Sequence, residues 1–430
     1  MPILRIFLLS GILFLFIGSC RKNETPDPPE PPAFELTFHN TFPLPEVEYA
    51  VFLSDEEGLI RAFRWLPGGD TARVAVPDAK TGDLFDCTVV GINTLSIPGT
   101  GIFDTTVVLT TYTNLSDGAD IHLRSPDFVQ TTDLYVAFTN FTSLDAVVVP
   151  DGLTFAQPQA VNNYQGQYRI LHSGRFWLRL RINGESEWRY ASFDAANTPT
   201  VNVALDAANL PAITSPPATV SLPFFAPWSF RIDRVIDAGQ QQFLAIGDNI
   251  PIPGGPVPIF DQLDVFEPPD PSTGTYRLRL SGTDVEPGSY TYHCDRLTSP
   301  LPATIPAPAF DIQPTTVAGP RVVAVKCIGT FDLLSFTREQ KGSVNVRWEA
   351  LAAPAGNNGI VTYRLPDVPK DLSDRFPQLK SYDNFGPSVR VRAENYDLYN
   401  AFPAALAPRL LQDDPLWQMK AGYVGRERVF

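Results

Sequence analysis

Four histidines and two carboxylate clusters are the residues of this sequence whose types could support catalysis. The histidines are His39, His122, His172 and His293, which lie far apart in the chain. They can meet only through the fold, so we expect each to be a loop or sheet-surface residue and predict no metal site. The sequence contains no G-x-S-x-G, H-E-x-x-H, G-x-x-x-x-G-K or G-x-G-x-x-G motif. It therefore predicts no catalytic residue and no cofactor.

The carboxylate clusters keep one enzymatic alternative open. Glycoside hydrolysis needs only two carboxylates, and the fold rather than the local sequence places them. Asp55-Glu56-Glu57 lies at an expected hairpin tip, where a solvated turn explains it. Asp413-Asp414 precedes Pro415, where the end of a helix explains it. A carboxylate-dependent glycoside hydrolase is thus an alternative and not the main interpretation.

Pairs of arginines on one face of a strand are candidates for ligand binding. Such pairs occur at Arg179/Arg181, Arg277/Arg279 and Arg390/Arg392. They could recognise an anionic glycan or a peptide carboxylate through bidentate contacts. Cross-strand glutamates would explain an arginine-bearing face equally well.

Two tryptophans fall outside the expected core faces. Trp177 lies on the charged face of its strand, and Trp228 lies in a proline-rich segment expected to be a loop. An exposed aromatic ring can stack on a sugar or anchor a protein partner, although packing against a neighbouring domain is the alternative. Trp177, Trp228, Arg179 and Arg181 are the predicted ligand-binding residues.

Three cysteines lie in the body of the chain. Cys87 alternates with Phe85 and Val89, so we expect it to point into a core. Cys294 and Cys327 lie in strand-like runs of one region and could form a disulfide in an oxidising compartment. No C-x-x-C motif occurs, which leaves redox and zinc-ribbon functions without support.

From residue 34 onward, apolar residues recur with a period of two, which indicates strands. A first hairpin is expected around a turn at Glu56-Glu57-Gly58. If Gly58 adopts the left-handed conformation of a three-residue loop, Val51 faces Phe63 and Tyr49 faces Trp65.

A second hairpin is expected over residues 175–190, with the loop Ile182-Asn183-Gly184. This loop would place Phe176 opposite Tyr190 and Leu178 opposite Trp188. It would also pair the charged face, as Arg181 with Glu185 and Arg179 with Glu187. The side-chain chemistry selects this register over that of a two-residue loop.

The spacing of strands and turns predicts an all-β chain of tandem antiparallel β-sandwich domains, immunoglobulin-like or transthyretin-like. The best helix candidate is 401–411, interrupted by Pro408. Prolines number 42 of 430 residues, and proline-rich stretches at 214–228, 250–258, 267–271 and 299–308 predict loops or linkers. The expected domains are 34–125, 126–215, 216–345 and 346–430, the last with a short helix.

The N-terminus resembles that of bacterial lipoproteins. Arg5 precedes an apolar run from Ile6 to Ile17, which is too short to span a bilayer and is typical of a signal peptide. Ile17-Gly18-Ser19-Cys20 resembles the lipobox of that family, whose usual leucine is replaced here by Ile17. The resemblance implies that residues 1–19 are removed and that Cys20 carries fatty-acyl chains such as palmitate, which anchor the protein in the lipid bilayer.

Residues 20–33 would then form the lipidated end and a proline-rich tether about 35 Å long. Arg21 after the cysteine resembles the default for sorting to the outer membrane. The expected location is the outer membrane or the cell surface.

The net charge of −14 argues against binding to nucleic acid. The sequence thus predicts a membrane-anchored extracytoplasmic lipoprotein, a non-enzymatic surface module that binds a glycan or a protein. A fimbrial or adhesin-like structural subunit is the first alternative. The sequence makes no prediction about the oligomeric state.

Overall fold

The computed structural model describes a mostly β chain, with most of its described residues in strands. The described residues are 33–40, 47–97, 102–123, 132–141, 144–148, 164–170, 174–182, 184–195, 200–213, 218–221, 225–237, 242–249, 262–265, 274–284, 290–305, 308–316, 321–380, 385, 388–399, 401–411 and 422–430. The predicted signal peptide, Cys20 and the tether lie outside them. No helix in these ranges is long and apolar enough to cross a membrane.

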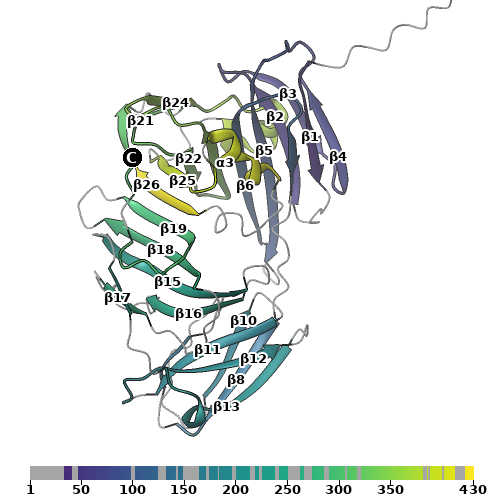
Figure 1. Ribbon diagram of the computed structural model, residues 1–430. Coiled ribbons are helices and arrows are strands. Elements are labelled where there is room, and N and C mark those ends of the chain that lie inside the picture. Colours follow the sequence, from purple (N-terminus) through teal and green to yellow (C-terminus); the bar gives the residue numbers. More distant parts are fainter. Residues whose placement is uncertain are drawn as a thin grey trace, which may run out of the picture.

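The largest sheet among the described residues has twelve strands. Its strands, in order across the sheet, are β16 (Gln242–Asn249), β15 (Phe225–Asp237), β18 (Tyr276–Asp284), β19 (Thr291–Thr298), β26 (Tyr423–Val429), β25 (Arg390–Tyr396), β22 (Leu333–Gln340), β23 (Val344–Ala352), β6 (Ile102–Leu115), β5 (Phe85–Ile97), β2 (Val47–Ser54) and β3 (Ile60–Leu66). Neighbouring strands are antiparallel except β23 and β6, which run parallel. Figure 1 shows the sheet descending from the end that carries both β2 and β22 toward β15 and β16.

The sheet is covered on both faces at the end that contains β2, β5, β6, β22 and β23. On one face, a first hydrophobic core lies beneath β20 (Asp311–Thr316), β21 (Val322–Ile328), β24 (Ile360–Arg364), α2 (Lys370–Arg375) and the 3-10 helix η2 (Pro377–Lys380). On the other face, a second core lies beneath β4 (Asp70–Ala75), β1 (Glu35–Asn40), β7 (Asp120–His122) and α3 (Phe402–Leu411).

Strand β2 has apolar side chains on both of its faces, as a strand between two cores requires. Ala50 and Phe52 point into the first core, and the intervening Val51 and Leu53 point into the second. A strand with apolar residues at every position suits a sheet covered on both faces. Cys87, predicted to be a core residue, is fully buried in the second core.

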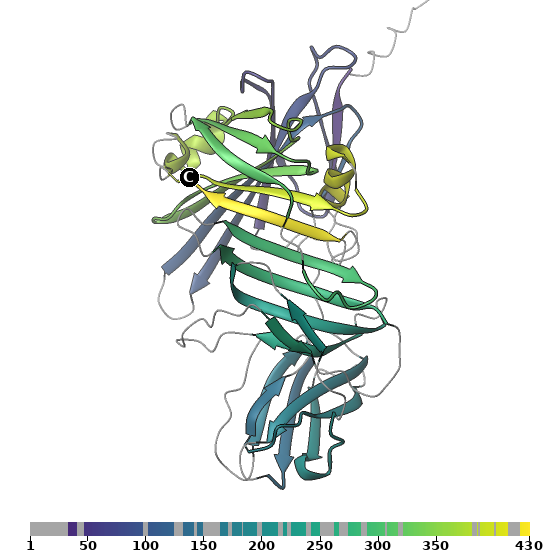
Figure 2. The ribbon, with the colours of Figure 1, turned by 60° about the vertical axis from the view of Figure 1, so that its left-hand side comes forward.

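A second group of strands lies at the opposite end of the molecule, as both ribbon views show (Figures 1 and 2). It has two three-stranded sheets, one with β10 (Tyr164–Ile170), β8 (Thr132–Thr139) and β13 (Thr200–Asp206), the other with β12 (Arg189–Ala195), β11 (Gly174–Ile182) and β9 (Leu144–Val148). The 3-10 helix η1 (Ala207–Asn209) follows β13, and the two-stranded pair β14 (Ala218–Ser221) and β17 (Gln262–Val265) lies near β16.

The first predicted hairpin forms, but the observed register differs by one residue from the predicted register. β2 and β3 pair Phe52 with Phe63 and Val51 with Arg64, and the register shifts near Ser54. Gly58 does adopt a positive φ of 80°. The expected pairing assumed one apolar face, whereas β2 is apolar on both faces, so side-chain pairing could not select the register.

The second predicted hairpin has a longer turn than expected. β11 ends at Ile182 and β12 starts at Arg189, with Leu178 opposite Ala191 instead of Trp188. Trp188 is buried outside the ladder and has Arg179 stacked on its ring, with 4.2 Å from the guanidinium carbon to the ring centroid. Glu185 pairs within the turn with Arg189, at 2.9 Å, and not with Arg181. A buried tryptophan and a local ion pair therefore determine the turn.

The helix predicted over 401–411 forms as α3 and runs through Pro408. The proline-rich stretch expected to be a loop at 214–228 instead contains β14 and the start of β15, which includes Trp228. The structure shows a mostly β chain with several sheets, as the prediction requires, but the sandwich type of the predicted domains is not confirmed. The twelve-stranded sheet takes strands from segments 34–125, 216–345 and 346–430, and the expected boundary between 345 and 346 lies inside β23.

Candidate functional site

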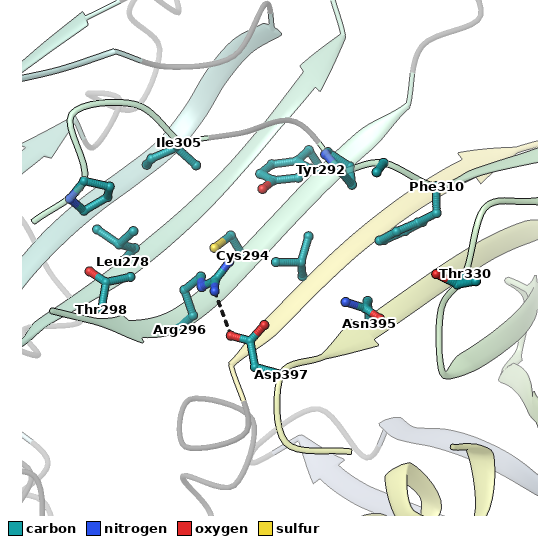
Figure 3. Close-up of a pocket in the computed structure, with 14 residues that line it drawn as sticks. Leu278, Tyr292, Cys294, Arg296, Thr298, Ile305, Phe310, Thr330, Asn395 and Asp397 are labelled. Atoms are coloured by element: carbon teal, nitrogen blue, oxygen red, sulfur yellow. Dashed lines mark hydrogen bonds and ion pairs between the residues drawn. The ribbon is translucent and has the colours of Figure 1, made fainter. Parts of the chain in front are cut away.

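A pocket of about 440 Å³ lies over β18, β19, β26 and β25, and residues of 301–305 and 308–310 also line it (Figure 3). It opens where the first core meets a third core, which packs β14, β17, β18 and β19 together. Its lining is mainly apolar at the base and polar at one end. The lining residues are Leu278, Tyr292, Cys294, Arg296, Thr298, Pro302, Ile305, Pro308, Ala309, Phe310, Thr330, Asn395, Asp397 and Val424.

The alternation of β19 builds the floor of the pocket. Tyr292, Cys294, Arg296 and Thr298 are two residues apart, so their side chains leave the same face of the strand. Burial of this face follows the same alternation, with Tyr292 and Cys294 buried. A single strand therefore supplies an apolar half and a polar half of the site.

Hydrogen bonds at one end and a glycine at the other hold the lining residues of 301–305 and 308–310. Ile305 donates its backbone N–H to the carbonyl of Ser221 at 3.0 Å, and Ser221 donates to the carbonyl of Ala303 at 2.9 Å. At the far end, Gly329 has a φ of 79°, and a Cβ there would lie 2.8 Å from the carbonyl oxygen of Ala309. Only glycine lets residues 308–310 approach this closely.

An ion pair between Arg296 and Asp397 marks the polar end. The Arg296 Nη2 donates to the Asp397 Oδ2 at 2.8 Å, and Figure 3 shows the two side chains pointing toward one another. Both side chains are partly exposed, so the pair lies at the rim. Gly422, with a φ of 68°, permits this arrangement, because a Cβ there would collide with the Asp397 carboxylate.

Two polar atoms of the lining are enclosed without a hydrogen-bond partner among the described residues. They are the Nε of Arg296 and the Oγ1 of Thr298. Buried polar atoms normally have a partner, and leaving one unpaired costs about 1–3 kcal/mol. A ligand that carries hydrogen-bonding groups beside an apolar body would suit such a lining.

The chemistry of the lining does not favour covalent catalysis. Burial raises the pKa of the Cys294 thiol to about 12, so at neutral pH it is not a thiolate nucleophile. Burial also raises the pKa of Tyr292 above its usual value. Among the described residues that line this pocket Asp397 is the one carboxylate, whereas glycoside hydrolysis needs two.

The predicted ligand-binding arginines lie elsewhere. Arg179 is 3% exposed, and its Nη1 donates to the carbonyl of Ile246 in β16 at 3.3 Å. Arg181 stacks on Trp188 at 5.2 Å. Trp177 lies in β11 opposite Ser192, and Trp228 falls where the register of β15 shifts between Pro227 and Ser229. Neither Arg179 nor Arg181 is among the described residues that line the pocket.

Arginines on β15 and β18 form ion pairs with aspartates. Arg277 holds Asp295 through two hydrogen bonds of 2.8 Å. Arg279 and Arg231 both bind Asp233, which is fully buried. Although burial opposes the charge of Asp233, the two guanidiniums hold the pKa of this carboxyl at about 2.

The disulfide predicted between Cys294 and Cys327 does not form. Both are free buried cysteines, and they belong to different clusters, Cys294 to the third core and Cys327 to the first. A shared region of sequence did not place them side by side, because β19 and β21 belong to different sheets.

The fold does bring two of the histidines together. His39 in β1 and His122 in β7 are register partners, with ring centroids 4.6 Å apart, and the His39 Nε2 lies 3.3 Å from Asp120. No group of three or more histidine, cysteine or acidic residues suited to a metal occurs in the described ranges. His293 departs from the expected sheet surface: it is half-buried in β19, and burial lowers its pKa to about 4. His172 lies outside the described residues.

Sequence reasoning missed the pocket, apart from Cys294. The available signal was the alternation from Tyr292 to Thr298, which places four side chains on one face. Pro302, Ile305 and Phe310 follow β19 closely in sequence, whereas Asn395 and Asp397 come from a distant part of the chain, so local patterns could not predict them.

Comparison with known proteins adds little. No protein-family model matches the chain, and a search of curated proteins finds no similar sequence. Among solved structures, the tip fimbrial protein Mfa3 from Porphyromonas gingivalis, with C-terminal truncation, matches at 10% identity with a TM-score of 0.15. The match covers 37% of this chain and 81% of that one. A likeness this distant supports no statement about function.

Proposed function

We propose that the chain is a lipid-anchored protein of the outer membrane or cell surface that binds a ligand and catalyses no reaction. The pocket carries this proposal: it has a volume of about 440 Å³, an apolar floor and a polar rim. Clefts of this size and composition are typical of small-molecule and peptide sites. The ligand class that fits is an apolar group with one polar or anionic end, such as part of a glycan or a peptide, with the polar end beside Arg296.

The test is a glycan and peptide array probed with the full chain in detergent. We expect a saturable hit that Arg296→Met weakens at least tenfold and that Ile305→Trp, which fills the pocket, abolishes. Arg321→Met is the matched control, because Arg321 forms a similar ion pair with Asp367 at 2.6 Å, away from the pocket lining. A hit that survives both pocket variants, or no hit at all, would contradict the proposal.

The anchor is tested separately. Cells supplied with a labelled palmitate analogue should label the wild-type chain, and Cys20→Ala should lose both the label and its fractionation with membranes. Labelling that persists in Cys20→Ala would refute lipidation at this residue.

A second candidate function is a structural subunit of a fimbria-like surface assembly. The observation in its favour is the outer edge of β3, which pairs with no other strand among the described residues. An unpaired edge can accept a strand from another chain. Crosslinking in intact cells would separate the two functions, since an assembly predicts a ladder of oligomers that Ala62→Pro in β3 interrupts.

A further inference from the structure

Arg338 is a buried arginine with no ion pair among the described residues. It lies near the end of β22 and is 4% exposed. Leu334, Phe336 and Arg338 alternate along β22, so Arg338 points to the face of the first core. Its partner across the ladder is Trp348. Its Nε and Nη2 are both enclosed and have no hydrogen-bond partner among the described residues.

The same two nitrogen atoms bind carboxylates elsewhere in this chain. Arg277 uses Nε and Nη2 to hold both oxygens of Asp295, at 2.8 Å each. Arg189 uses them to hold both oxygens of Glu185, at 2.9 and 3.2 Å. This side of the guanidinium is a planar fork that matches a carboxylate. In Arg338 the same two nitrogen atoms are enclosed and have no hydrogen-bond partner in the described ranges.

A guanidinium that is buried without a partner lowers the stability of the folded chain. Burial disfavours the charged form and lowers the pKa of Arg338. Chains normally avoid this cost by pairing the charge or by placing the group in water. In the described part of the chain Arg338 has no such partner and is largely out of water, although Lys341 nearby is exposed.

We propose that Arg338 is the anchor of a second binding site, which takes a carboxylate group from a ligand into the Nε/Nη2 fork. A carboxylate suits the site better than phosphate, because its single charge neutralises one guanidinium, whereas a phosphate dianion would leave an excess negative charge beside Trp348. Gln340 adds an amide group two residues along the same face, with its Oε1 also enclosed and unpartnered. The site is separate from the pocket, whose lining does not include Arg338.

The small exposed fraction of Arg338 places it just beneath the surface. A small carboxylate can reach it once a covering side chain moves, and acetate is therefore the probe. The proposal does not depend on the ligand of the pocket, since the two sites share no residue.

The experiment measures unfolding of the full chain in detergent at constant ionic strength, with sodium acetate replacing sodium chloride. We expect acetate to raise the unfolding temperature of the wild type. Beyond the dissociation constant, each tenfold increase in acetate should raise the ratio of folded to unfolded protein about tenfold. Arg338→Met should abolish this response. Lys341→Met, which removes the same charge from an exposed position nearby, should keep it.

Three outcomes would overturn the proposal. They are an acetate series identical to the chloride series in the wild type, an unchanged acetate response in Arg338→Met, and stabilisation by inorganic phosphate but not by acetate. If Arg338→Met does not fold, the wild-type protein alone still tests the site. Trp348 lies opposite Arg338, so its fluorescence should change saturably with acetate. No saturable change in that signal would also reject the site.

Discussion

At the scale of single residues, one cluster of buried charge is centred on Glu394. This residue is 1% exposed and accepts hydrogen bonds of 2.6 Å from the Tyr396 hydroxyl and the Arg409 Nη2. Arg392 approaches its other oxygen at 3.2 Å. Burial alone would raise the pKa of Glu394, but Arg409 and Arg392 outweigh it and lower the pKa. The carboxylate thus links α3, which carries Arg409, to β25.

We predict that Glu394→Gln destabilises the fold by about 3–5 kcal/mol, because it removes the buried negative charge that Arg409 and Arg392 both approach. Urea unfolding monitored by circular dichroism measures this loss. Glu339→Gln is the control: its ion pair with Arg390 is long, at 3.7 Å, and partly exposed, so the change should stay below about 1 kcal/mol. Equal effects of the two substitutions would refute the role of Glu394.

His293 should make stability depend on pH. Burial, and then the positive charge of Arg392, lower its pKa in the folded chain to about 4, whereas the reference value is 6.5. Below pH 6.5 His293 binds a proton in the unfolded chain but not in the folded chain. The free energy of unfolding therefore decreases as the pH falls from about 6.5 to about 4. The slope contributed is at most about 1.4 kcal/mol per pH unit.

His293→Asn should remove that part of the slope. Unfolding free energies measured between pH 4 and pH 7 check it. Glu394 faces the same cluster, and because its pKa is lowered in the folded chain, its own contribution starts to be lost as the pH falls toward the reference value of 4.5, at the acid end of this window. An unchanged slope in the variant would mean that His293 is protonated equally easily in both states.

At the scale of elements, the start of β26 depends on a glycine. Gly422 combines a φ of 68° with the close approach of Asp397, and its carbonyl accepts from the Asp397 N–H at 3.0 Å. We predict that Gly422→Ala costs about 1–3 kcal/mol, since it strains the backbone and displaces Asp397 from Arg296. Thermal unfolding measures the cost. Gly274→Ala, where a Cβ meets nothing within 4 Å, should be nearly neutral.

The registers of the hairpins show how far the sequence determines the elements. The alternation predicts the existence of β2, β3, β11 and β12, and the helix α3 was predicted nearly to its ends. Registers were wrong where they depended on distant contacts: β2 is covered by two layers, and Trp188 has two arginines of β11 stacked on its ring. The pocket was missed for the same reason, because its walls join segments that no local pattern relates.

At the scale of the whole molecule, Arg179 connects the strand group β8–β13 to the twelve-stranded sheet. It stacks on Trp188 and donates to the carbonyl of Ile246 on the outer strand β16. We predict that Arg179→Met loosens this connection, so that proteases cut between the two parts several times faster while the core around Glu394 keeps its hydrogen-exchange protection. Arg73→Met, an exposed arginine paired with Glu35, should leave the cleavage rate unchanged. Equal cleavage of both variants would argue against the link.

The parallel pairing of β23 with β6 also has a consequence for timing. The indole N–H of Trp348 donates to Thr111 across 237 residues of sequence, and both side chains are buried. At 5–20 residues per second, a ribosome would need roughly 10–50 s to supply the second strand after the first. During that interval β6 has an open, apolar edge in a chain that emerges N-terminus first. The main sheet is thus completed late, and a nascent chain that stops short of β23 would leave a strand able to pair with another molecule.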